Sequence, residues 1–181
     1  HTSTENLDII PANIDLSAAE VQLVNEVARE SALARVLRHV ESDYDVVLID
    51  CQPSLGLLAV NALTAAHGVI VPVEAEFFAL RGVALLVETI ETVRDRINPR
   101  LKIDGIVATM VDSRTLHSRE VLQRLQEAFG DLVFDTRIGR TIKFPDASVA
   151  TEPIISYAPN HAGAHAYRRL AREVIARGDA A

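Results

Sequence analysis

The sequence contains no tryptophan, a single cysteine, and no apolar run near the length of a membrane helix. Cys51 cannot form a disulfide within the chain, which predicts a reducing, cytoplasmic compartment. The longest apolar runs, residues 69–73 and 103–111, fall well short of the about 20 residues that a spanning helix needs. Acidic residues outnumber basic ones by 25 to 18, and the net charge of −7 excludes a basic coat over the whole surface.

Glycine is also scarce, with 8 in the chain, and no Gly-Lys-Thr or Gly-Lys-Ser triplet occurs. That triplet closes the glycine-rich loop that cradles phosphates in many nucleotide-binding proteins. The chain begins with His1 rather than methionine, so we expect a processed protein or a fragment of a longer one.

The charge that is present is unevenly distributed. Residues 1–111 carry 8 basic and 16 acidic side chains, whereas residues 112–181 carry 10 basic and 9 acidic ones. The last third of the chain is therefore locally basic, which leaves room for a basic patch on an acidic protein.

Short apolar runs alternate with helical patterns along the chain. Residues 7–10, 46–50, 69–73 and 103–111 are continuous apolar runs of the kind that is buried on both faces of a parallel sheet, and residues 132–134 resemble them less closely. We therefore expect one α/β domain over residues 1–181 with a mostly parallel sheet.

The helical patterns have recognisable starts and ends. Ser17 and Glu20 form a capping box, and an apolar stripe runs from Val83 to Ile97. Residues 117–129 end at a glycine, and residues 162–177 form the last predicted helix. In sheets of this type ligands bind at the carboxyl ends of the strands, so the functional residues are expected just after Asp50, Val73 and Val111.

Asp50 ends the apolar run of residues 46–50 and precedes a turn shaped by Pro53 and Gly56. In nucleotidases a carboxylate at this place holds the Mg²⁺ shell beside the phosphates. The alternative is that Asp50 only caps a helix that starts near Ser54.

Six segments in the right order resemble the ParA/Soj family of deviant-Walker ATPases, and together they cover nearly the whole chain. The segment Asp50-Cys-Gln-Pro-Ser-Leu-Gly56 is similar to the family's D-C-P-P-S-L-G. The other five are Leu7-Asp-Ile-Ile-Pro-Ala-Asn-Ile-Asp-Leu16, Val60-Asn-Ala-Leu-Thr-Ala-Ala66, Val71-Pro-Val-Glu-Ala-Glu-Phe-Phe-Ala-Leu80, Thr109-Met-Val-Asp-Ser-Arg-Thr115 and Gly163-Ala-His-Ala-Tyr167.

The resemblance implies a three-layer sandwich of the P-loop NTPase type with a mostly parallel sheet. The family's glycine-rich K-G-G-x-G-K-[ST] loop lies upstream of the first matching segment, so the P-loop strand and helix are missing from this sequence. Mg-ATP is the cofactor implied for an intact parent protein. Because its backbone amides and lysines are absent, we expect this chain alone to bind ATP weakly and not to hydrolyse it.

Site residues follow from the same resemblance. Asp50 would be the catalytic, Mg²⁺-linked carboxylate, acting on the metal indirectly. Nucleotide-binding positions would be Gln52, Pro53, Met110, Asp112, Pro145 and Asp146. Gln52 replaces the family's usual proline, residues 144–148 replace R-L-S-E-A-P-S, and Ile138-Gly-Arg140 replaces I-P-R.

The resemblance also implies non-specific DNA binding through Arg114, Arg140 and Lys143. Contacts to DNA phosphates need only cations at suitable places and are strongly salt-dependent. The alternative is that these residues, like Arg172 and Arg177 on the last helix, only solvate a surface or complement a helix dipole.

The function that follows is ATP-dependent dimerisation and DNA binding in chromosome or plasmid partitioning. It implies a ParB-like partner, a homodimer, a nucleoid-associated place in the cytoplasm and no membrane contact. Two alternatives remain: a non-catalytic interaction module of the same fold, and a MinD-like positioning ATPase. The last helix lacks the bulky apolar residues of a membrane-binding helix.

Overall fold

The computed structural model describes the chain except for residues 1, 3, 77–78 and 180–181. Two phenylalanines of the segment at residues 71–80 therefore lie outside the described residues. The chain divides into two compact units, residues 1–65 and 66–181, and each is described by itself. The first unit contains the helices α1 (Leu16–Gln22), α2 (Ala32–Leu37) and α3 (Leu57–Ala65). Short 3-10 helices lie between them, at Leu23–Asn25, Arg29–Ser31 and Glu41–Asp43.

Two strands expected in the first unit are not formed. Residues 7–10 and 46–50 pair with no other strand in the part of the chain that the structure describes. Their apolar side chains are exposed, with Ile10 at 83% and Leu48 at 84%. An apolar run becomes a strand only when a neighbour accepts its backbone hydrogen bonds, and the described residues provide no such neighbour. A hydrogen bond of 2.7 Å from the Tyr44 hydroxyl to Asp8 links the starts of the two segments.

The predicted capping box is also wrong. Helix α1 begins before Ser17, and the Ser17 hydroxyl donates to the carbonyl of Ile14. The Glu20 carboxylate instead accepts the N–H of Leu58 at the start of α3, at 3.3 Å. The buried side-chain amide of Asn61 then joins α3 to α2 by accepting the N–H of Leu33 at 3.0 Å.

The second unit is built around two parallel strands, β1 (Gly68–Glu74) and β2 (Lys102–Thr109). Both were expected from their apolar runs. Helix α4 (Ala79–Arg96) connects them, as a parallel crossover requires. Its predicted stripe is confirmed at Val83, Ile90 and Val93, which are at most 5% exposed. At Ile97 the prediction is wrong, because this residue lies beyond the end of α4 and is 40% exposed.

A third segment follows β2 without forming a full strand. Isolated parallel bridges join Ile106 to Val133 and Val111 to Gly139. Helix α5 (Leu116–Phe129) precedes this segment and matches the prediction closely. The Thr115 hydroxyl accepts the N–H of Ser118 at its start, and Gly130 takes a positive φ of 50° at its end.

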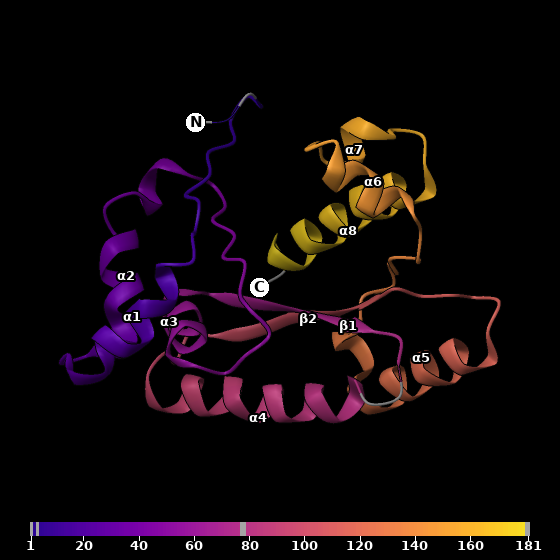
Figure 1. Ribbon diagram of the computed structural model, residues 1–181. Helices are drawn as coiled ribbons and strands as arrows, with labels where there is room; N and C mark the ends of the chain where they lie inside the picture. The colour runs from indigo at the N-terminus through magenta and orange to yellow at the C-terminus, as the bar shows by residue number, and fades with distance from the viewer. Residues whose placement is uncertain (1, 3, 77–78, 180–181) are drawn as a thin grey trace. The chain divides into compact units, whose positions relative to one another are not determined.

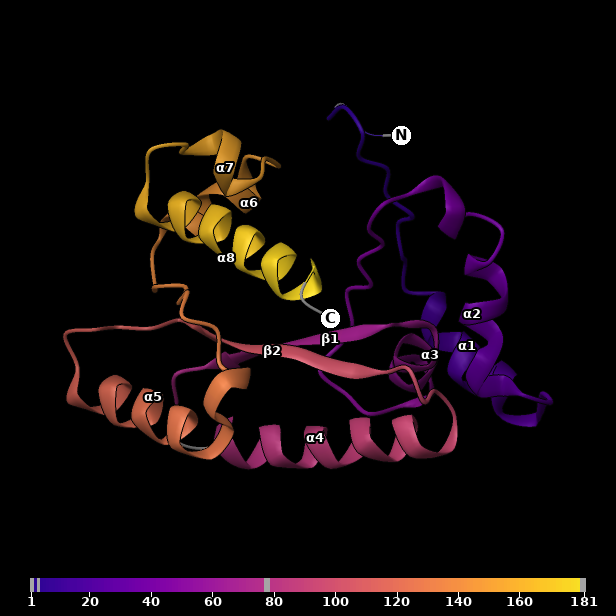
Figure 2. The ribbon, with the colours of Figure 1, turned by 180° about the vertical axis from the view of Figure 1, so that it is seen from behind.

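Three helices complete the second unit: α6 (Lys143–Val149), α7 (Ile154–Tyr157) and α8 (Ala162–Asp179). Both views show α4 and α5 on one side of the sheet and α8 on the other (Figures 1 and 2). The second unit thus has the α/β/α layers expected from the sequence. Its core on the α8 side is formed by Val107, Phe134, Ile138 and Ala166.

No helix among the described residues is both long and apolar enough to cross a membrane.

Candidate functional site

The carboxyl end of β2 gathers several predicted site residues of the second unit. Met110 follows the strand directly, is 42% exposed and takes a positive φ of 53°. A non-glycine residue in this region is held there by its surroundings, which often marks a functional place. Two backbone hydrogen bonds fix the chain here. The N–H of Val111 donates to the carbonyl of Ile138, and the N–H of Arg140 donates to the carbonyl of Val111. Met110, Asp112 and Arg140 are therefore fixed at one edge of the sheet.

Asp112 and Arg114 form a two-point ion pair at this edge. The guanidinium donates through Nε and Nη2 to the two carboxylate oxygens, at 2.9 and 2.8 Å. The backbone N–H of Arg114 donates to the same carboxylate at 3.1 Å and closes a tight turn. The hydrogen bonds from the Arg114 side chain and backbone hold the pKa of Asp112 at about 2, below its ordinary value of 3.8.

This pair predicts an acid-dependent contribution to stability. Because the pKa of Asp112 is lower in the folded chain, the contribution is complete above about pH 4 and is lost as the pH falls toward 2. Carbon-detected NMR of the Asp112 carboxyl should show a midpoint near 2, and Arg114→Gln should raise it toward 3.8. The amide spectrum checks that the chain stays folded. A native midpoint near the ordinary value would mean that the pair does not form in solution.

The other two predicted DNA-binding cations also lie beside carboxylates. Arg140 is 3.8 Å from Glu76, which follows β1. Lys143, in the first turn of α6, lies 3.1 Å from Asp146 and sits over the ring of Tyr157 at 5.9 Å. The Asp146 carboxylate raises the pKa of Lys143, so this side chain stays charged at neutral pH.

Residues 144–148, expected to close over a nucleotide base, form most of α6. Pro145 is exposed in the first turn of this helix, where its missing N–H costs no hydrogen bond. The ring of Phe144 packs edge-on against Tyr167 of α8, with 5.7 Å between the centroids. The side of α6 that carries Phe144 is therefore fixed against α8, while Pro145 faces solvent.

Asp50, Gln52 and Pro53 belong to the first unit, and all three are exposed. The N–H of Ser54 donates to the carbonyl of Gln52 at 2.8 Å, so the expected turn is formed. Helix α3 starts only at Leu57, which rules out the alternative that Asp50 caps it. Among the described residues, no three histidine, cysteine or acidic side chains come together as a metal site.

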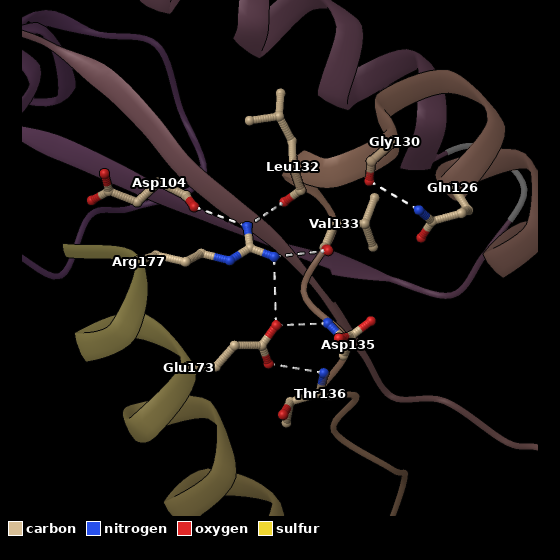
Figure 3. Close-up of polar contacts among 9 residues, drawn as sticks. All are labelled: Asp104, Gln126, Gly130, Leu132, Val133, Asp135, Thr136, Glu173 and Arg177. Carbon is tan, nitrogen blue, oxygen red and sulfur yellow. Dashed lines mark hydrogen bonds and ion pairs between the residues drawn. The ribbon is translucent and has the colours of Figure 1, made fainter. Parts of the chain in front are cut away.

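A polar clamp between α8 and the segment after α5 was not predicted from the sequence and is shown in Figure 3. Arg177 donates to the carbonyls of Asp104, Leu132 and Val133 at 3.0–3.2 Å. One turn earlier, Glu173 accepts the N–H groups of residues 135 and 136 at 2.8 and 3.1 Å. The sequence signal was present, because both residues continue the inward stripe of the helix. The clamp holds the segment that leads to Arg140.

The second unit also carries two shallow grooves, the first of which includes the ion-pair partner of Arg140. One, of about 380 Å³, runs between β1 and α4 and includes Glu74 and Glu76 beside apolar side chains. The other, of about 350 Å³, is lined by α5 and Arg137. None of the predicted site residues lines either groove.

Comparisons with known proteins agree with the resemblance. Residues 1–103 match the model of a family described as an AAA domain. An uncharacterized protein of Mycobacterium tuberculosis is 62% identical over 98% of this chain and 56% of its own length. The sporulation initiation inhibitor protein Soj of Bacillus subtilis is 44% identical over 98% of this chain and 70% of its own length.

Solved structures also match this chain in sequence and in fold. A cobyrinic acid a,c-diamide synthase of Mycobacterium smegmatis, solved with an ATP analogue and magnesium, is 44% identical and superposes with a TM-score of 0.75. It is matched over 88% of this chain and 59% of its own. The chain thus spans a little over half the length of its mycobacterial relatives. The family model and the identity to Soj over nearly all of the chain establish that it belongs to the ParA/Soj family of partition ATPases.

Proposed function

We propose that this chain is part of a partition ATPase that dimerises with Mg-ATP, and that the chain itself carries the surface that binds DNA without sequence preference. The observation that carries the proposal is the carboxyl edge of the sheet, where Arg114 and Arg140 lie near Asp112. Lys143 follows three residues after Arg140, in the first turn of α6. Cations within reach of solvent at such an edge suit phosphate contacts, which need no base recognition. The ATP analogue and magnesium of the 44% identical neighbour support the same cofactor for this chain.

In the proposed reaction, Mg-ATP supplies the phosphoryl group and the metal that neutralises its charge. Asp50 would hold the metal's water shell, and Gln52 and Pro53 would form the turn that senses the terminal phosphate. Met110, Asp112, Pro145 and Asp146 would bind the rest of the nucleotide. This chain carries no Gly-Lys-Thr or Gly-Lys-Ser loop, so hydrolysis would need a phosphate-binding loop from another segment of polypeptide. Sequencing the coding region upstream of His1 tests this directly.

The DNA contacts predict a specific salt dependence. A labelled duplex titrated with the chain should show log K falling with log salt by about 0.9 for each phosphate contact. Arg140 has the longest ion pair of the three, at 3.8 Å, which leaves it the most available to a phosphate. Arg140→Ala should therefore weaken binding and flatten the slope by up to about 0.9. Fluorescence anisotropy at several salt concentrations measures both.

Arg100→Ala is the matched control, since Arg100 is exposed just before the amino end of β2. It removes the same charge at the opposite end of the strand. Equal effects of the two substitutions would mean that only the net charge matters, and the assigned surface would be wrong.

The homodimer, the ParB-like partner and the nucleoid-associated cytoplasmic location belong to the same proposal. A MinD-like membrane role is less well supported, because one apolar face of α8 packs inward: Ala164 and Ala166 are buried, and Leu170 packs on the core. Tyr167 and Ile175 are exposed but do not form the bulky apolar face of a membrane-binding helix. A non-catalytic interaction module remains the competing function. An upstream coding region without a glycine-rich loop would select it.

A further inference from the structure

Each cation assigned to DNA binding is already neutralised by a carboxylate of the same unit. Arg114 pairs with Asp112 at 2.8 Å, Lys143 with Asp146 at 3.1 Å, and Arg140 with Glu76 at 3.8 Å. The partners come from three different places: the turn after β2, the helix α6 and the end of β1. A DNA phosphate that approaches any of these cations therefore meets an ion pair instead of a free cation.

The Arg114 pair shows how direct the competition is. Two parallel N–H donors facing two oxygens is the geometry in which arginine binds a phosphate as well as a carboxylate. Phosphate and Asp112 therefore compete for the same two donors, Nε and Nη2. The Arg114 side chain is 87% exposed whereas that of Asp112 is 29% exposed, so the cation is accessible and the carboxylate is the anchored member of the pair.

We propose that Asp112, together with Glu76 and Asp146, acts as a built-in competitor that masks the DNA-binding cations. This inference rests on the proposed function and adds a regulation to it. DNA affinity is then set by whether these carboxylates are engaged elsewhere. Asp112 and Asp146 are also proposed nucleotide-site residues, so a ligand that drew on either carboxylate would release its cation. By linkage, DNA would favour that ligand to the same degree.

The test neutralises one carboxylate without disturbing its turn. Asp112→Asn keeps an oxygen that can accept the backbone N–H of Arg114, so the loop retains its hydrogen bond. Binding of a labelled duplex to the 181-residue chain is measured by fluorescence anisotropy over a range of salt. We expect Asp112→Asn to bind about two- to five-fold more tightly, the range expected when an exposed ion pair is removed. Its salt slope should steepen by about 0.9, one phosphate contact.

Asp95→Asn is the matched control. Asp95 also pairs with an arginine, Arg94 at 3.3 Å, but on α4, so the variant has the same net charge and loses the same kind of ion pair. If the two variants gain DNA affinity equally, the gain comes from the change in net charge alone. The proposal that Asp112 masks Arg114 would then be wrong.

A double substitution shows whether the gain acts through Arg114. Arg114→Gln alone should change DNA binding little, because the guanidinium is occupied. The same substitution added to Asp112→Asn should abolish the gain, a non-additivity that identifies the pair. A gain that survived in the double variant would contradict the proposal, and circular dichroism confirms that each variant is folded.

The outcomes separate this inference from the proposed function. If the unchanged chain binds DNA and Asp112→Asn does not tighten it, the masking is wrong and DNA binding stands. If only the Asp112→Asn variant binds, the masking is supported in its strongest form. If neither chain binds at low salt, both the masking and the DNA-binding surface are wrong.

Discussion

Replacing Phe134 with alanine is expected to lower the free energy of unfolding of the second unit by about 3–5 kcal/mol. Its ring is 1% exposed and packs against Val107, Ile138 and Ala166. Gly105 also lies against the ring, where an added Cβ would come within 2.4 Å of it. Because Gly105 has no side chain that could move into the space left by the ring, alanine would leave a cavity.

The measurement is amide hydrogen exchange along β2, which reports opening of this unit separately from residues 1–65. Leu132→Ala is the control: it removes a large apolar side chain from the same segment, but one that is 36% exposed. Its expected cost is about 1 kcal/mol or less. Similar losses in both variants would show that the core does not centre on Phe134.

Local sequence patterns were sufficient to predict an element whose position and ends are determined by its own residues and their near neighbours. Helix α5 was predicted to within a residue from its pattern and from Gly130, which ends it with a positive φ. The structure adds a cap at its start, the side chain of Thr115. The strands β1 and β2 were predicted because a continuous apolar run fits a position buried on both faces. Each of these signals acts within a few residues of the element that it defines.

The same reasoning failed at residues 7–10 and 46–50. Their apolar runs are as clear as those of β1 and β2. Both segments nevertheless carry exposed apolar side chains and pair with no strand in the described structure. An apolar run encodes the tendency of a chain to be buried and extended, whereas the hydrogen-bonding neighbour is supplied by another part of the fold. The carboxylate of Asp50 is consequently exposed at the end of a segment that no sheet holds among the described residues.

The candidate site shows the same division. The Asp112–Arg114 pair could be expected from the sequence, because an aspartate two residues before its partner commonly closes a turn. The approach of Glu76 to Arg140 could not, since it depends on the parallel register of β1 and β2 and on the bridge from Val111 to Gly139. Glu173 and Arg177 also resemble an ordinary helix-surface ion pair, and only the fold shows that their main partners are backbone groups.

Replacing Arg177 with methionine is expected to lower the free energy of unfolding of the second unit by about 2–3 kcal/mol. The reason is that one charged guanidinium group donates hydrogen bonds to three carbonyls. Methionine keeps the apolar stem and removes only the guanidinium fork. The fork also stacks on the ring of Phe134, with its carbon 4.1 Å from the ring centroid. Glu173 would keep its two backbone N–H partners, so the loss should be confined to residues 104 and 132–134.

Two variants test whether this loss of stability depends on the planar guanidinium group of Arg177. Amide hydrogen exchange on β2 is the measurement. Arg172→Met alters a neighbouring exposed arginine of α8 whose Nε donates to a carbonyl of its own helix, and it should cost about 0.5 kcal/mol or less. Arg177→Lys keeps the charge but not the planar fork, so it should recover only part of the loss. Full recovery by lysine would mean that charge alone holds α8 to this segment. Partial recovery would show that the fixed spacing of the guanidinium donors keeps residues 133–140 beside β2, and with them the position of Arg140.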